Sequence, residues 1–179
     1  MTTQTPDRAP TPAGRPPDDG IDGLWAATHG ANAAWRHARS VQSALDDVAA
    51  AFETGDWDLC IESCAQALRG IIVCSYCLEG MKGVPDRGEL HLRIAVADLP
   101  AAAALRGLPA SHGATEAEAV RASAVVAEQD AMLRARLPFE LPVIRGAAMH
   151  VPTVRVTAQV ARWRAERGLG PLDWDRSGI

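Results

Sequence analysis

The sequence lacks several patterns that would place it in a common class. No run approaches the ~18 consecutive apolar residues that span a bilayer, and no stretch alternates polar and apolar residues as a half-buried strand does. No internal repeat appears. The first residues include no hydrophobic stretch of the kind found in signal peptides. These absences favour a helical protein of the cytoplasm without a membrane span.

Charge of either sign is modest overall but unevenly distributed. The formal net charge is −4, which argues against binding nucleic acid over the whole surface. Between Arg134 and Arg167, however, there are seven arginines and two acids, so this segment is +5 and the remainder sums to −9. Lys82 is the single lysine. A local basic face of this kind is what an RNA or phosphate ligand requires.

At 179 residues the chain predicts one domain with appendages. Residues 1–22 contain five prolines among the first seventeen positions and predict a disordered tail. Residues 23–168 form the predicted bundle, and residues 169–179 a C-terminal tail. The apolar spacing predicts helices over about 24–54, 57–80, 88–99, 100–106, 115–137 and 152–167. The predicted fold is therefore an all-α bundle of four to five principal helices.

Local signals mark the helix ends. Gly55 ends the first helix, and Asp56 is suited to cap the second. Thr115 and Glu118 have the spacing of a capping box, which opens the helix that follows.

Four cysteines, Cys60, Cys64, Cys74 and Cys77, have spacings that metal ligands also use. On one continuous helix, however, the two pairs lie roughly 15–20 Å apart at about 1.5 Å per residue. One tetrahedral ion cannot bind all four thiolates across that distance. We interpret them as small buried apolar residues and predict neither a metal site nor a cofactor.

The segment "PVIRGAAMHVP", residues 142–152, places Arg145 five residues before His150. RNA cleavage by internal transesterification needs proton transfer at two oxygens and stabilisation of a negative phosphorane. Histidine exchanges protons near neutral pH, and arginine offers a fixed charge with a fork of donors for phosphate. In a regular helix, positions five apart diverge by about 140°, so the two side chains converge only where the backbone is irregular.

Three stretches together resemble the HEPN superfamily of small helical bundles: "FETGDWDLCIESCAQALRGIIVCSYCLEG", "GVPDRGELHLRIAVADL" and "IRGAAMH". The resemblance covers roughly residues 34–168. It implies a homodimer and metal-independent RNA cleavage, in a toxin or defence system. Arg145 would stabilise the phosphate and His150 would act as acid and base, and the basic side chains of the last helix, Arg155, Arg162 and Arg164, would bind the nucleic acid.

Two other functions remain open from the residues alone. The protein could be a non-catalytic helical module that binds a partner protein or a nucleotide, with the proline-rich tail as a contact for that partner. It could instead be a small-molecule-binding or biosynthetic bundle whose pocket lies among Trp35, Trp57, Tyr76 and the cysteines.

Overall fold

The structure is a computed structural model, and it describes residues 19–79, 98–141 and 153–170. Within these ranges the chain forms helices and no strand. The helices are α1 (Asp19–Thr54), α2 (Trp57–Glu79), α4 (Pro100–Arg106), α5 (Glu116–Arg136) and α6 (Thr153–Glu166). The predicted all-α bundle is confirmed. The helix predicted over 88–99 lies outside the described residues. Residues 19–22, assigned to the tail from their composition, belong to α1.

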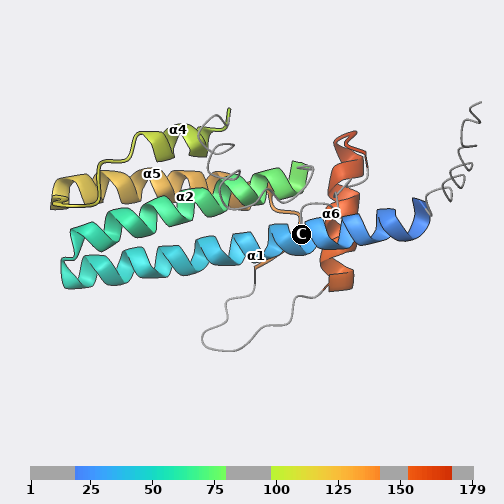
Figure 1. Cartoon of the computed structure of the whole chain (residues 1–179), viewed down its shortest axis with the longest axis horizontal. Helices are drawn as coiled ribbons and strands as arrows, with labels where there is room; N and C mark the ends of the chain where they lie inside the picture. The colour runs from blue at the N-terminus through green and yellow to red at the C-terminus, as the bar shows by residue number, and fades with distance from the viewer. Residues whose placement is uncertain (1–18, 80–97, 142–152, 171–179) are drawn as a thin grey trace, which may run out of the picture.

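The helices form two groups in space (Figure 1). Helices α1, α2 and α5 lie side by side along the long axis of the molecule, with α4 over α2 and α5. Helix α6 crosses this layer and packs mainly on the N-terminal half of α1. The crossing places the first turns of α6 near the end of α5, which is where the segment of Arg145 and His150 joins the described parts of the chain.

Helices α1 and α2 form an antiparallel hairpin with the tight connection that the sequence predicts. Gly55 has a φ of 68°, a left-handed conformation that ends α1. The Asp56 carboxylate accepts a hydrogen bond from the Leu59 amide at 3.0 Å, so it caps α2 as expected. Farther along the hairpin, Gly70 lets the two backbones approach closely. A Cβ at this position would lie 2.8 Å from Cγ2 of Val41.

Helix α2 is the central helix of the bundle, because α1, α4, α5 and α6 all pack against it. Among the described helices it alone is long and apolar enough to cross a bilayer by length and composition. Of that apolar stretch, 67% is buried inside the protein, as in the core helix of a bundle. Its largest fully buried side chains are Ile61, Leu68, Ile72 and Leu78.

The connection from α4 to α5 is attached to the start of α2. Asp58 accepts hydrogen bonds from the amides of Gly113 and Ala114, at 3.2 and 2.9 Å. The capping box predicted for α5 is confirmed, since the Thr115 hydroxyl accepts from the Glu118 amide and Glu118 accepts from the Thr115 amide. These bonds fix where α5 begins and hence where its other end lies.

Candidate nucleic-acid interface

Arg145 and His150, the predicted catalytic pair, lie outside the described residues. The structure does describe both flanks of their segment. The chain is described up to Leu141 on one side and again from Thr153, the first residue of α6, on the other.

Helix α5 ends at Arg136, two residues before Pro138. The Leu137 amide still donates to carbonyls of the last helical turn, but Leu137 itself is extended, with a ψ of 131°. An extended conformation is the one favoured before a proline, and Pro138 has no amide with which to continue the helix. Phe139 then turns inward and is buried in the core. Phe139 thus holds the chain after α5 against the bundle.

Between this turn and α6 lies an open cavity of about 690 Å³. It mixes apolar residues of the turn with polar side chains from both helices. Its walls are formed by Arg134, Leu137, Pro138, Phe139, Glu140, Leu141, Arg155 and Gln159. We refer to it as the α5–α6 cavity.

Two arginines give the α5–α6 cavity its cationic groups. Arg134 pairs with Asp130 through Nε at 2.6 Å, one helical turn earlier, which balances part of its charge. Arg155 is exposed, and it makes no ion pair with any residue in the described parts of the chain. The amide oxygen of Gln159 is buried and lacks a hydrogen-bond partner. The first turns of α6 also contribute the positive end of the helix dipole. The two guanidinium groups and this helix end suit an anionic ligand, whereas the Gln159 oxygen, an acceptor, and the carboxylate of Glu140 in the same wall do not.

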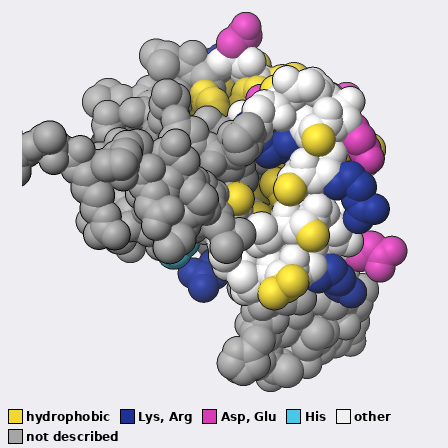
Figure 2. All heavy atoms as spheres, turned by 90° about the vertical axis from the view of Figure 1, so that its right-hand side faces the viewer, with side chains coloured by type: hydrophobic (Ala, Val, Ile, Leu, Met, Phe, Trp, Pro, Cys, Tyr) yellow, Lys and Arg dark blue, Asp and Glu magenta, His cyan; other side chains and the backbone are white. Residues whose placement is uncertain are grey.

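The three arginines predicted to bind nucleic acid separate into two sets. Arg155 and Arg162 are exposed and seven residues apart, so they lie on one face of α6 with Gln159 between them. Arg164 points to the opposite side and is only 6% exposed. Figure 2 shows the end of the molecule that carries α6, where arginine side chains lie exposed among apolar ones.

Arg164 hydrogen-bonds to the protein itself. Its Nε donates to the Gly170 carbonyl at 2.8 Å and its Nη1 to the Leu78 carbonyl at 2.7 Å. Burial lowers the pKa of this guanidinium, and the charge of Glu79 acts against that effect. Arg164 therefore joins α6 to the end of α2, and of the three predicted arginines only Arg155 and Arg162 are exposed.

The four cysteines are all buried with free thiols. Cys74 donates to the Ala34 carbonyl of α1, with 3.3 Å between sulfur and oxygen. Burial raises the pKa of Cys64 and of Cys77 from 9.0 to about 12, so these thiols stay protonated at neutral pH. No group of three or more possible metal ligands occurs in the described ranges. The thiols thus serve as packing groups of the α1–α2 interface.

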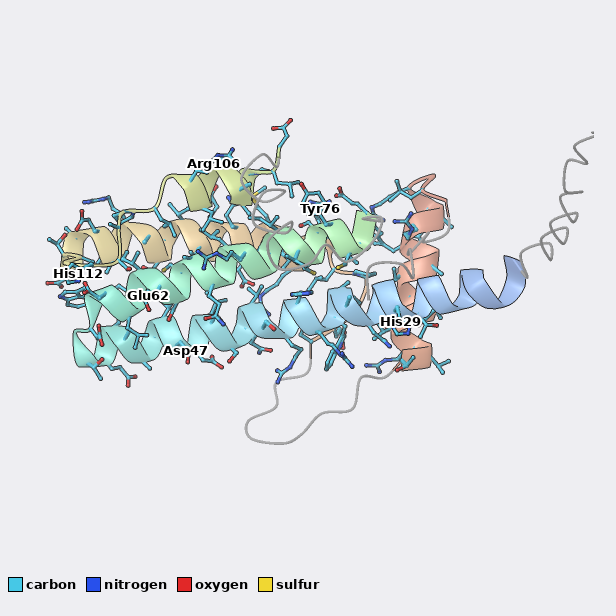
Figure 3. All side chains as sticks on the ribbon, in the orientation of Figure 1. His29, Asp47, Glu62, Tyr76, Arg106 and His112 are labelled. Atoms are coloured by element: carbon cyan, nitrogen blue, oxygen red, sulfur yellow. The ribbon has the colours of Figure 1, made fainter. Side chains whose placement is uncertain are left out.

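The described histidines do not gather into a site. His29 and His112 lie towards opposite ends of the molecule (Figure 3). His112 is exposed, with Nδ1 3.8 Å from Oδ2 of Asp58. His37 is partly buried in α1, and burial lowers its pKa. His91 lies outside the described residues.

The aromatic residues considered for a small-molecule pocket are used in packing. Trp35 is a core residue, only 3% exposed. The Trp57 ring meets Phe52 edge to face, with centroids 5.5 Å apart. Tyr76 is half-buried at the α2 surface.

Comparison of the chain with models of known protein families, with curated proteins and with solved structures gave no match. Function therefore has to be argued from the site.

Proposed function

We propose that the protein is a metal-independent endoribonuclease or RNA-processing protein of the cytoplasm, acting in a toxin or defence system. The observation that supports this most is the α5–α6 cavity, an open space with two guanidinium groups located at the junction with the Arg145–His150 segment.

Chain length limits how far the proposed catalytic residues can lie from that cavity. Arg145 follows the cavity residue Leu141 by four positions, and His150 precedes Arg155 by five. A chain spans at most ~3.6 Å per residue. The Cα atoms of Arg145 and Leu141 are thus separated by no more than about 14 Å. Both side chains can approach a phosphate held in the cavity.

In this scheme two arginines of α6 bind the RNA strand, and the Arg145–His150 pair carries out the cleavage. Arg155 and Arg162 lie about 10 Å apart along α6, at ~1.5 Å per residue, so each can contact a different phosphate of one strand. Arg145 would stabilise the charge on the scissile phosphate. His150 would take the proton from the 2′-hydroxyl or return one to the leaving 5′-oxygen. This scheme uses no metal ion.

Cleavage of a mixed-sequence single-stranded RNA in EDTA tests the proposal. We expect wild-type cleavage, its loss in H150A and R145A, and weaker substrate binding in R155A. R121A is the matched control, because Arg121 is an exposed arginine of α5 that does not line the cavity. Absence of wild-type cleavage, or cleavage that persists in both H150A and R145A, would reject this function.

A second candidate is a non-catalytic module that binds a protein, and the outer face of α5 favours it. This face is exposed and apolar, with Val120 49% exposed, and consists of Ala117, Val120, Ala124, Ala127, Ala131 and Ala135. Acidic residues occupy the first turn of α5 and arginines its last turn. Two copies packed antiparallel through this face would bring opposite charges together, giving the homodimer expected from the resemblance. Light scattering of wild type and A124R distinguishes a dimer through this face from a monomer. Because the ribonuclease is also expected to be a homodimer, a dimer without RNA cleavage in the assay above is the result that favours this second candidate.

A further inference from the structure

A second cavity lies on the other side of α6. It has a volume of about 290 Å³ and opens between α6 and the N-terminal half of α1. The space is open because the side chains around it are small, with Ala27 of α1 opposite Ala161 and Ala165 of α6. The lining is mainly apolar and comprises Ala27, Thr157, Val160, Ala161, Arg164, Ala165, Leu169 and Gly170. We refer to it as the α1–α6 cavity.

Two polar groups in this apolar lining have hydrogen-bonding capacity that the described residues do not use. The Arg164 guanidinium has five N–H donors, of which the two hydrogen bonds to Leu78 and Gly170 use two. Its other donors make no hydrogen bond to the described residues. The Thr157 hydroxyl is buried and has no partner either, although a helical threonine commonly bonds a carbonyl of the preceding turn.

An unsatisfied buried hydroxyl such as that of Thr157 is costly and in native proteins usually has a reason, whereas no atom of Arg164 is both fully buried and unpartnered. Arg164 and Thr157 are seven residues apart on α6, so both face the same cavity. The charge of Arg164 is also incompletely balanced. Glu79, the acid whose charge acts on it, is itself paired with Arg136. The cavity therefore offers a positive charge and unused N–H donors within alkyl walls, and the buried Thr157 hydroxyl lies in the same wall.

We propose that the α1–α6 cavity binds a small monocarboxylate with an apolar body. The carboxylate accepts hydrogen bonds from the unused N–H groups of the Arg164 guanidinium, and from the Thr157 hydroxyl once a change of rotamer turns it into the cavity. The apolar body lies against Val160, Leu169 and the alanines. The volume is at the lower end of the roughly 300–1,000 Å³ usual for ligand sites, which limits the ligand to a short chain or a single ring. This site is separate from the α5–α6 cavity and does not depend on RNA cleavage.

Calorimetric titration with octanoate tests this site, with octanol as the uncharged probe of equal length. We expect octanoate to bind and octanol to bind at least tenfold more weakly, because octanol lacks the charge that Arg164 recognises. T157V keeps the shape of the side chain and removes the hydroxyl. It should fold normally and lower octanoate affinity by roughly fivefold.

Filling the cavity provides a test that leaves Arg164 in place. A161F introduces a large ring into the cavity, whereas A158F introduces the same ring at an exposed position of α6 that does not line it. We expect A161F to abolish octanoate binding and A158F to retain it. Equal binding of octanol and octanoate, no binding of octanoate to wild type, or equal octanoate affinity in A161F and A158F would each overturn the proposal.

Discussion

The close approach of α1 and α2 at Gly70 makes a quantitative prediction. In G70A the new methyl group would lie 2.8 Å from Cγ2 of Val41 and 3.6 Å from the His37 carbonyl oxygen. Ordinary contacts between carbon atoms are ~3.5–4.0 Å long. Val41 cannot rotate away easily, because it is β-branched, helical and 1% exposed. The two helices must therefore move apart.

Two opposing effects set the size of the change. Overpacking of a well-packed core costs about 1–3 kcal/mol, and replacing glycine by alanine inside a helix contributes about 1 kcal/mol in the other direction. We expect G70A to lower the free energy of unfolding by about 1 kcal/mol. In a V41A background the clash is absent, so the same substitution should raise it by about 1 kcal/mol.

Urea denaturation followed by circular dichroism measures this double-mutant cycle. The expected coupling between positions 41 and 70 is about 2 kcal/mol, well above the error usual for such cycles. If G70A stabilised the protein equally in both backgrounds, the helices would not be in the close contact described, and the argument would be wrong.

The remaining predictions concern a cap, the thiols and the RNA surface. T115A should lower the free energy of unfolding by about 1 kcal/mol, and T115S should not, in the same urea assay. Burial raises the pKa of Cys64 and of Cys77 from 9.0 to about 12, so the unfolded chain loses these protons first. The contribution of the two protonated thiols to the free energy of unfolding is present below pH 9.0 and is lost as the pH rises towards 12. Urea denaturation midpoints between these pH values, compared with those of a variant that has alanine at positions 64 and 77, measure this loss. R155A should reduce the slope of log affinity against log salt for single-stranded RNA by about 0.7, and R121A should leave it unchanged.

The helix ends could be predicted from the sequence because their causes are local. Gly55, Asp56 and the Thr115–Glu118 pair act within three or four residues, so the chain itself shows which groups can meet. The placement of the α6 arginines on two faces of the helix could also be predicted from the sequence. Spacing of seven places Arg155 and Arg162 on one face, and Arg164 falls on the other.

The hydrogen bonds that Arg164 makes could not be predicted from this spacing. Its acceptor in α2 lies 86 residues away in the sequence, and no periodicity connects the two positions. The α1–α6 cavity likewise depends on alanines of α1 and α6 that meet only when the bundle is assembled. The residues of the predicted catalytic pair fall outside the described ranges, so their arrangement stays a prediction.

The two hydrogen bonds of Arg164 also bear on how the protein opens. One guanidinium joins the last turn of α2, helix α6 and the residues after it. Detaching α6 would expose the buried face of α1 and leave the Leu78 carbonyl without this partner. Opening of α6 should therefore cost more free energy than the fraying of a helix end, and its amides should exchange with solvent correspondingly slowly.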